Sequence, residues 1–334
     1  MDELAKNILK TLIWFDLFEY PLTAMEVFNY YLSAFALNGQ AEGYGGQASI
    51  FSELQNLIQK KVIEYKDNFY FLSGREEIVN TRKTREVESE RKLKRAKRAA
   101  KFLGWLPFVR AVIVCNVLGY KNAKAEDDID FLVITAPGRI WTARWFATGF
   151  FKILNLRPNR KTIKNKFCFS FYLAEDGLNL EKIKLADDPY LIWWFAGLIP
   201  LYDAGGVFER FMKENEWIKE YLPNLKKCVI PGSRPTSPGQ SPGGRVTRDP
   251  EKKFLDSGSR AGMTIKNICQ FVASLFPEKI YQKFQSLIMP KILKNQANKT
   301  PGVIINDQIL KFHLVDRRAE FAKRYKKRIM NYEL

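Results

Sequence analysis

The spacing of apolar residues predicts two helices at the start of the chain. Residues 4–18 carry apolar side chains at helical spacing, and Pro21 ends this pattern. Thr23 and Glu26 then fit a capping box, in which each side chain accepts a hydrogen bond from the backbone N–H of the other residue. A second helix should therefore begin here and run to Leu32.

A third helix and a hairpin should follow. Asn38–Gln47 is rich in glycine and is interpreted as a loop, after which Ser49–Lys60 again has helical spacing. Two short β-prone runs, Val62–Tyr65 and Phe69–Leu72, are separated by turn-forming residues. Three helices and a hairpin in this order are typical of a winged helix-turn-helix domain, which we place at residues 1–74.

Charge weakens the DNA-binding reading of this domain. Residues 1–72 hold five Lys and nine Asp or Glu, which gives them a formal charge of −4. Because the whole chain carries +18, the residues after 72 carry +22. DNA affinity depends on cations that neutralise phosphates, and the candidate recognition helix offers mostly Ser, Gln and Asn on its polar positions. A DNA-binding regulator and a domain that packs against the rest of the chain or a protein partner both stay open.

A long charged helix should connect this domain to an α/β core. Residues 75–103 combine eleven Lys or Arg and five Glu with a narrow apolar stripe, which fits either a solvated face or a polyanion-binding face. Strand-like and helical runs then alternate over residues 104–190, which predicts an α/β (α+β) core. The expected core elements are the strands 108–115, 131–135 and 167–173 and the helix 140–156.

The last third of the chain is predicted to be mainly helical. Residues 191–231 read as a helical extension, and 232–262 as a disordered linker, because Pro231–Gly244 contains four Pro, four Gly and no aliphatic or aromatic side chain. Helical spacing resumes in residues 263–334, a C-terminal helical region that ends in the basic segment Arg317–Met330.

The composition of the chain limits the class of protein and the cellular compartment to be expected. With 46% hydrophobic and 14% aromatic residues it can bury substantial cores, so wholesale disorder is excluded. The longest apolar run, Pro189–Tyr202, is shorter than the roughly 20 residues of a membrane-spanning helix. No export signal and no Cys-x-x-Cys pair is visible. We therefore expect a cytoplasmic protein without a membrane partner, and any RNA or other polyanion should bind residues after 72.

Two carboxylates carry the sharpest chemical signal. Asp128 and Asp130 begin an apolar strand, and the two-residue period of a strand places both on one face, roughly 6 to 7 Å apart. Convergent carboxylates suit Mg²⁺ or Mn²⁺, hard ions that prefer oxygen ligands and are commonly shared with phosphates. The alternative is an acidic turn, Glu126–Asp128, that only caps the strand.

The surrounding residues resemble the nucleotidyltransferase superfamily, which has the DNA polymerase β-like fold. Its pattern is an apolar strand, a Gly-Ser or Gly-Gly turn, a gap, and then Asp-apolar-Asp or Asp-apolar-Glu. Here the strand 112–115 precedes Asn116 and Val117, and ten residues later come Asp128 and Asp130. The resemblance implies that the two Asp residues are catalytic metal ligands and that Asn116, Val117 and Gly119 line the nucleotide site.

Two features depart from the family pattern. The family turn grips the triphosphate with backbone N–H groups and a hydroxyl, whereas Val117 has no hydroxyl and Asn116 carries a side chain in place of Gly. The family also takes a third carboxylate from a later strand, and that position should fall near Ser170, on the face shared with Cys168 and Tyr172. Neither Ser nor Cys supplies the missing anion, and Glu175-Asp176 is more simply a turn.

The resemblance implies attack by an acceptor hydroxyl on the α-phosphate of an NTP, with pyrophosphate leaving. We expect a Mg²⁺- or Mn²⁺-dependent nucleotidyltransferase acting on a nucleic acid, a protein or a small molecule, with an activity that the two departures could weaken. One alternative is a catalytically degraded core kept as a nucleotide-binding or sensing module. The other is the winged-helix DNA-binding regulator.

Three further features have weaker chemical interpretations. Five cations lie between the core helix and the next strand, where they could bind RNA, another polyanionic acceptor or the triphosphate, or simply be solvated: Arg157, Arg160, Lys161, Lys164 and Lys166. His313, the single histidine, is expected to be a packed or surface residue. Gly43–Gly46 follows no strand, so a phosphate-binding loop is not expected there.

Overall fold

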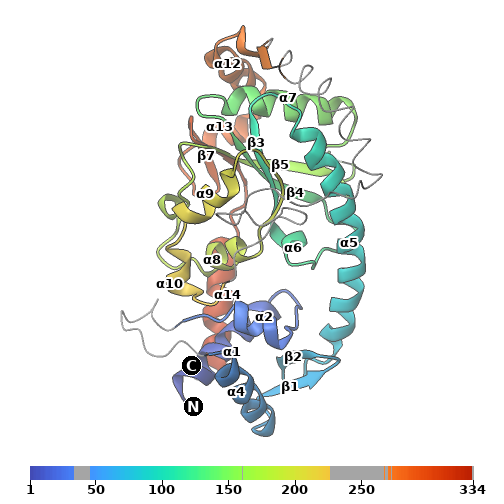
Figure 1. Ribbon diagram of the computed structural model, residues 1–334, viewed down its shortest axis with the longest axis vertical. Coiled ribbons are helices and arrows are strands. Elements are labelled where there is room, and N and C mark those ends of the chain that lie inside the picture. Colours follow the sequence, from blue (N-terminus) through green and yellow to red (C-terminus); the bar gives the residue numbers. More distant parts are fainter. Residues whose placement is uncertain (34–45, 160, 226–266, 268–269, 272, 333–334) are drawn as a thin grey trace, which may run out of the picture.

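The computed structural model is a mixed α/β protein, as the sequence predicts. Among the described residues it has twelve α-helices, a six-stranded mixed sheet and a small N-terminal hairpin (Figure 1). The description covers all residues except 34–45, 160, 226–266, 268–269, 272 and 333–334. The predicted linker 232–262, Arg160, and most of the predicted glycine-rich loop with Gly43–Gly46 therefore lie outside the described residues.

The N-terminal part contains the predicted three helices and hairpin. The elements are α1 (Glu3–Asp16), α2 (Ala24–Asn29), α4 (Gln47–Gln59), β1 (Ile63–Lys66) and β2 (Phe69–Leu72). The capping box is confirmed: the Glu26 amide donates to Thr23 Oγ1 at 3.2 Å, and the Thr23 amide donates to Glu26 Oε2 at 2.9 Å. The second helix ends at Asn29, three residues before the predicted Leu32.

A single long helix, α5 (Glu77–Leu103), runs from the hairpin to the sheet along one side of the molecule (Figure 1). Its apolar stripe packs on the sheet, as the periodicity predicts. Three polar residues of this highly charged helix are nevertheless buried, namely Arg82, Ser89 and Lys92. These three side chains make contacts that the charge pattern alone does not reveal.

The six-stranded sheet has the strand order β6-β3-β4-β5-β8-β7. Its strands are β3 (Val109–Val114), β4 (Ile129–Thr135), β5 (Phe167–Ala174), β6 (Ile199–Asp203), β7 (Val303–Ile305) and β8 (Ile309–Phe312). Only β4 and β5 pair in parallel, and α7 (Ile140–Ile153) forms the crossover between them, as a parallel pair requires. The continuous apolar runs of β3 and β4 fit strands that are buried on both faces.

Helices cover both faces of the sheet. On one face, α8 (Pro189–Ala196), α9 (Val207–Glu214) and α10 (Ile218–Tyr221) share a hydrophobic cluster with α1, α2 and α4. On the other face lie α5, α7 and residues that flank α12 (Glu278–Ile288). The chain is completed by α6 (Asn116–Gly119), a short 3₁₀ helix (Glu181–Ile183), α13 (Lys291–Gln296) and α14 (Arg318–Asn331).

Two regions predicted to be helical contain strands, which corrects the sequence analysis. Within residues 191–231, β6 pairs with β3 at one end of the core sheet, and within residues 263–334, β7 and β8 join its other end. Each of these strands has only three to five residues, so each is too short for its periodicity to distinguish a strand from a helix. The core sheet therefore draws strands from beyond residues 104–190.

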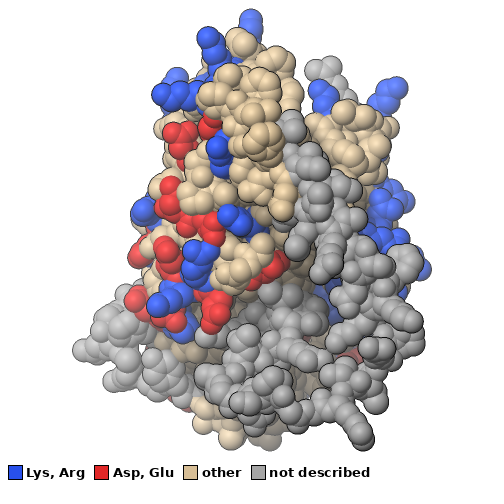
Figure 2. All heavy atoms as spheres, turned by 45° about the horizontal axis from the view of Figure 1, so that its top comes forward, with Lys and Arg blue, Asp and Glu red and all other residues tan. Residues whose placement is uncertain are grey.

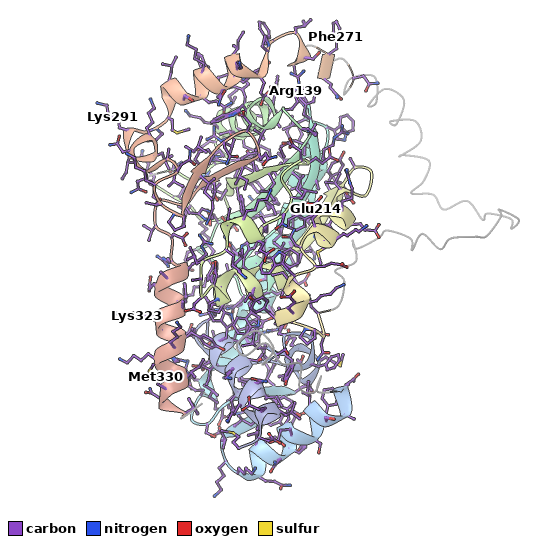
Figure 3. The ribbon with its side chains drawn as sticks, turned by 90° about the vertical axis from the view of Figure 1, so that its left-hand side faces the viewer. Arg139, Glu214, Phe271, Lys291, Lys323 and Met330 are labelled. Atoms are coloured by element: carbon purple, nitrogen blue, oxygen red, sulfur yellow. The ribbon has the colours of Figure 1, made fainter. Side chains whose placement is uncertain are left out.

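The two ends of the molecule differ in what they expose. Figure 3 shows α12 crossing one end between the labelled Phe271 and Lys291, while α14, with Lys323 and Met330, extends toward the other. Tyr325 of α14 donates to the backbone oxygen of Lys10 at 3.1 Å, so α14 packs against α1. Figure 2 brings the α12 end forward and shows Lys and Arg at the edges of a largely uncharged surface. No helix in the described part of the chain combines the length and the apolar character needed to cross a membrane.

Candidate functional site

The two predicted carboxylates lie together at the start of β4. Asp128 precedes the strand and Asp130 is its second residue, and each is partly buried. One ligand atom from each, together with the sulfur of Cys168 on β5, lies within 4.8 Å of the others. Among the described residues this is the one group of three acidic, Cys or His side chains close enough to share an ion.

Burial and mutual repulsion disfavour the ionised forms of the two carboxylates. Burial, followed by the charge of Asp130, raises the pKa of Asp128 to about 7. Burial also raises the pKa of Asp130, although hydrogen bonds from the Asn116 and Cys168 side chains oppose the change. Two buried anions this close repel each other, and a bound cation would relieve that repulsion.

Asn116 forms the turn between β3 and the carboxylates. Its φ is +57°, in the left-handed region where Gly is the default residue and Asn is among the few tolerated alternatives. Its side-chain oxygen accepts from Trp194 Nε1 at 2.8 Å, while its amide group bonds Asp130. The Asn116 side chain therefore links Asp130 to Trp194 of α8.

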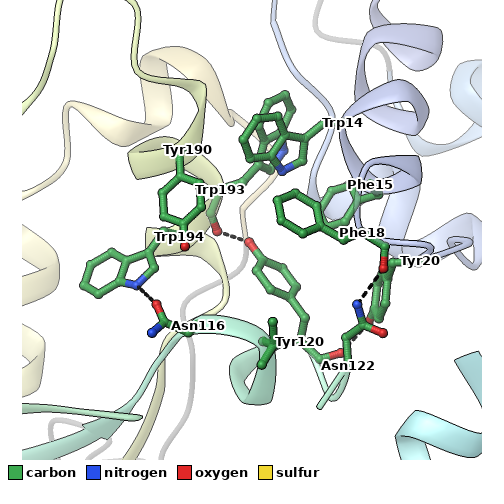
Figure 4. Close-up of a pocket in the computed structure, with 11 residues that line it drawn as sticks. Trp14, Phe15, Phe18, Tyr20, Asn116, Tyr120, Asn122, Tyr190, Trp193 and Trp194 are labelled. Atoms are coloured by element: carbon green, nitrogen blue, oxygen red, sulfur yellow. Dashed lines mark hydrogen bonds between the residues drawn. The ribbon is translucent and has the colours of Figure 1, made fainter. Parts of the chain in front are cut away.

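The other two predicted nucleotide-binding residues have different surroundings. Val117 is partly buried and lines an aromatic pocket of about 50 Å³ between α1, α6 and α8 (Figure 4). Trp14 and Trp193 stack in this pocket with ring centroids 4.7 Å apart. Gly119 meets α8 so closely that an added Cβ would lie 1.9 Å from the Gly197 carbonyl oxygen. A close approach of two backbones thus requires Gly119.

A β-bulge in β5 interrupts the alternation of faces just beyond the residue that neighbours the carboxylates. Asp130 pairs with Cys168, but Leu132 pairs with Phe171, so β5 has one extra residue between these two pairs. Tyr172 consequently belongs to the opposite hydrophobic cluster from Leu132 and Phe171. The prediction that Cys168 and Tyr172 share a face was wrong, because a regular two-residue alternation does not survive the bulge. Cys168 is the direct neighbour of Asp130.

A chain of hydrogen bonds leads from this neighbour into a cavity. The Cys168 thiol bonds Asp130, the Ser170 hydroxyl bonds Cys168, and Ser170 Oγ lies 2.8 Å from His313 Nε2. Burial, followed by the charge of Lys311, lowers the pKa of His313 to about 4, so the ring is neutral near pH 7. Neutral His313 can donate from Nε2 to Ser170 and keep Nδ1 as an acceptor.

The cavity beside Asp130 has a volume of about 310 Å³ and is lined partly by the C-terminal segment. Cationic residues at its wall are Lys311, Arg317 and Arg318, and aromatic ones include Tyr190 and Trp194. Among the described residues, the exposed guanidinium of Arg317 has no ion pair or hydrogen bond. This cavity places an available cation near the acidic pair.

Arg318 fixes the wall of the cavity. It is 5% exposed and donates to Asp188 Oδ2 at 2.9 Å, to Asp316 Oδ2 at 2.7 Å and to the Ile183 carbonyl at 2.8 Å. Burial alone would raise the pKa of Asp316, but the bond from Arg318 and the charge of Lys311 lower it to about 2. The network ties the C-terminal segment to the start of α8.

Lys92 of α5 holds the turn that carries Asp128. Its ammonium group is fully buried and donates to the carbonyls of Ala125 and Asp127 at 3.2 and 2.8 Å, and to Asn165 Oδ1 at 2.8 Å. Ser89, one turn earlier, accepts from the Ala123 amide at 2.9 Å. Sequence reasoning missed both residues, because nothing in a helix this rich in charged and polar residues indicates which of them are buried.

The predicted basic patch does not line the cavity. Arg157 lies over the Phe169 ring with 5.1 Å to the ring centroid, and its Nη1 is buried without a partner among the described residues. Lys166 donates to the Asn155 carbonyl, while Lys161 and Lys164 are exposed. These residues stay candidates for contact with a polyanion, on a surface separate from the cavity.

Comparison with known proteins gives no match: no protein-family model, no curated protein and no solved structure matches this chain. A functional assignment therefore depends on the residues and geometry described above.

Proposed function

We propose that this protein is a Mg²⁺-dependent nucleotidyltransferase, with Mn²⁺ as a substitute ion, that moves a nucleotidyl group from an NTP to an acceptor hydroxyl. The observation that supports this most is the position of Asp128 and Asp130. They lie close together at the start of β4, beside the left-handed turn at Asn116 and a cavity of about 310 Å³. Strand, turn and paired carboxylates are what the superfamily uses to hold an ion and a triphosphate together.

The donor set fits one hard cation. Asp128 and Asp130 supply anionic oxygens, which Mg²⁺ and Mn²⁺ prefer. Their raised pKa values indicate that a bound positive charge would stabilise the ionised carboxylates. Cys168 lies nearest to the pair on β5, although the third carboxylate was expected near Ser170, and a protonated thiol is a poor ligand for Mg²⁺. We therefore propose one bound ion rather than two.

The bound ion would supply charge neutralisation at the phosphates during transfer. Asp128 and Asp130 would hold it, and Asn116 and Cys168 would keep Asp130 oriented through their hydrogen bonds. Arg317, which is exposed at the cavity wall, would bind phosphate oxygens of the NTP. In the reaction, the acceptor oxygen bonds the α-phosphorus, its proton passes to a base or water, and pyrophosphate leaves.

The N-terminal part would serve this core rather than act alone. We interpret α1, α2, α4 and the β1-β2 hairpin as a winged helix whose first helix is buried against the core. Trp14 of α1 stacks on Trp193 of α8, and one hydrophobic cluster runs through both regions. An acidic domain packed in this way fits a structural role better than independent DNA binding.

The direct test is transfer of label from α-³²P-labelled NTPs, with Mg²⁺ or Mn²⁺ and total RNA or protein as acceptors. The wild-type protein should label an acceptor, and a variant with Asp128→Asn and Asp130→Asn should not. Glu126→Gln is the matched control, because it removes one exposed carboxylate of the same turn and should leave labelling intact. Equal labelling by wild type and double variant would refute the proposal.

One observation favours a second candidate, a nucleotide-binding module without catalysis. Cys168 faces Asp130, so the third carboxylate of the superfamily is missing from the position nearest to the pair. Such a module would bind Mg²⁺-NTP with an affinity that depends on Asp128 and Asp130, yet release the NTP unchanged. Binding without any labelled acceptor would favour this candidate over the transferase.

A further inference from the structure

Helix α12 is attached to the molecule through both polar and apolar side chains. Glu278 accepts hydrogen bonds from the backbone amides of Trp141 and Thr142 at the start of α7, at 2.5 and 3.2 Å. Gln285 is 2% exposed, donates to the Trp141 carbonyl at 2.6 Å and accepts from Arg144. Tyr281 and Met289 pack against the core on the same side, so the other apolar residues of the helix point away from it.

The outward side of α12 is an apolar stripe. Ile280, Phe284, Leu287 and Ile288 follow the i, i+4, i+7, i+8 spacing of one helix face, and their exposed fractions are 51, 50, 69 and 63%. A surface helix of a soluble domain normally has the opposite orientation. Exposed apolar side chains continue the surface on both sides of the helix, at Phe271, Leu275, Phe276 and Ile292. A contiguous apolar surface of this kind usually marks an interaction site.

Cations surround this apolar face. Residues 279–299 hold five Lys and no Asp or Glu, and residues 139–166, which include α7, hold eight Lys or Arg and no acid. Lys279, Lys283 and Lys291 are exposed. Figure 3 shows this face at one end of the molecule, and Figure 2 shows Lys and Arg at the edges of a largely uncharged surface there. An apolar stripe with a lysine border is the pattern of a helix that lies in the interface of an anionic bilayer.

We propose that the face formed by α12 and α13 binds the surface of an anionic lipid bilayer, with Ile280, Leu287 and Ile288 inserted among the lipids. Phe284 keeps its edge-to-face contact with Trp145, at 5.0 Å between ring centroids. The sequence analysis expected no membrane partner because no apolar run is long enough to span a bilayer. A helix that lies in the interface does not need such a run. This proposal is independent of the proposed transferase activity.

Charge and side-chain chemistry favour lipid over other occupants. The most exposed residues of the α12 stripe, Leu287 and Ile288, are aliphatic and offer no ring for base stacking, so RNA would leave them uncovered. A second copy using the same face would bring two cationic borders together. Residues 226–266 hold nine Lys or Arg against three acids, so this segment of the chain would also meet like charge. Anionic headgroups match the border, and acyl chains match the stripe.

The test is co-sedimentation of the full chain with sucrose-loaded vesicles. The protein should bind vesicles with about 30 mol% phosphatidylglycerol and bind neutral phosphatidylcholine vesicles at least roughly tenfold more weakly. Raising the salt from about 0.1 to about 0.5 M should weaken the anionic binding strongly. Equal binding to both vesicle types, or binding to neither, would overturn the proposal.

Matched variants assign the binding to α12. Leu287→Glu should weaken vesicle binding roughly tenfold or more, whereas Val87→Glu, an equally charged change at a 57% exposed apolar residue of α5, should not. Lys279→Glu with Lys283→Glu should also weaken binding, while the control Lys94→Glu with Lys97→Glu should have a much smaller effect. Leu287→Met keeps the apolar side chain and should keep the binding, which separates loss of contact from loss of folding.

Other occupants give distinct results. If Leu287→Glu abolishes a dimer seen by light scattering while wild type ignores vesicles, a second copy covers the face and the proposal fails. If Leu287→Glu instead abolishes RNA binding and vesicles are again ignored, the face belongs to nucleic acid. Equal losses for Leu287→Glu and Val87→Glu would also refute the assignment to α12.

Discussion

Two buried cations, Lys92 and Arg318, support different parts of the candidate site. Lys92 donates to two carbonyl oxygens on the turn before Asp128 and to the side-chain oxygen of Asn165, and the carboxylate of Glu88 is 3.8 Å away. Arg318 instead joins two carboxylates and two backbone carbonyls at the cavity wall. We infer separate structural roles: Lys92 sets the conformation of the turn before Asp128, and Arg318 sets the shape of the cavity.

The largest effect is expected from Arg318→Met. This change leaves Asp188 and Asp316 buried without their shared partner, so the free energy of unfolding should fall by about 3 to 5 kcal/mol. Chemical denaturation measures this loss, and amide hydrogen exchange should accelerate over residues 301–318. Mn²⁺ binding by the remaining folded protein should not change, whereas NTP binding should weaken roughly tenfold. Faster exchange spread evenly over the whole molecule would contradict a local role.

Lys92→Met should have a smaller effect in a different place. Three acceptor oxygens lose a charged donor, which should lower the free energy of unfolding by about 2 to 3 kcal/mol. Hydrogen exchange should accelerate over residues 123–128, and the C-terminal segment should keep its protection. Lys94→Met, on the exposed side of the same helix, is the control and should change neither quantity. If both lysine variants behave alike, the turn does not depend on Lys92.

The pairing of β5 with β4 leads to a prediction about two positions of β5, Cys168 and Ser170. Cys168→Asp places a third carboxylate next to Asp130 and should tighten Mn²⁺ binding by roughly three- to tenfold. Ser170→Asp introduces the same charge two residues further along β5 and should change the affinity much less. Calorimetric titration of the two folded variants distinguishes these positions. A stronger gain for Ser170→Asp would place the third-carboxylate position at Ser170, as the sequence analysis expects.

The smallest effect concerns His313. Its folded pKa of about 4 lies below its ordinary value of 6.5, so its contribution to stability is complete above pH 6.5 and declines as the pH falls toward 4. His313→Gln should remove this contribution to the pH dependence. The difference in melting temperature between pH 7 and pH 5 should therefore be smaller in the variant than in wild type. An unchanged difference would show that His313 does not titrate in this way.

Local patterns predicted more of the fold than long-range pairings did. The Thr23-Glu26 capping box and the helix 140–156 depend on neighbouring residues, and both the capping box and a helix over most of that range are present. The strands β6, β7 and β8 were missed, because a run of three to five residues becomes a strand only where a sheet edge is available. That edge is formed by residues far away in the sequence.

In the candidate site, too, local patterns predicted some residues, whereas the positions of others depend on long-range strand pairing. The spacing of Asp128 and Asp130 predicted that the two carboxylates lie together, and their ligand atoms are within 4.8 Å of each other at the start of β4. Tyr172 was misplaced because a single extra residue in β5 resets the alternation beyond Cys168. Lys311, Arg317 and Arg318 reach the cavity only because β8 pairs with β5. No local pattern connects these residues to Asp130.

Calorimetric titration with Mn²⁺ at pH 8 tests the central claim most directly, with wild type, Glu126→Gln and the double variant Asp128→Asn, Asp130→Asn. The account predicts one ion per chain for wild type and Glu126→Gln, and no measurable binding for the double variant. Because the pKa of Asp128 is about 7, wild-type affinity should also fall when the pH is lowered from 8 to 6. Equal Mn²⁺ affinity in wild type and the double variant would contradict the account.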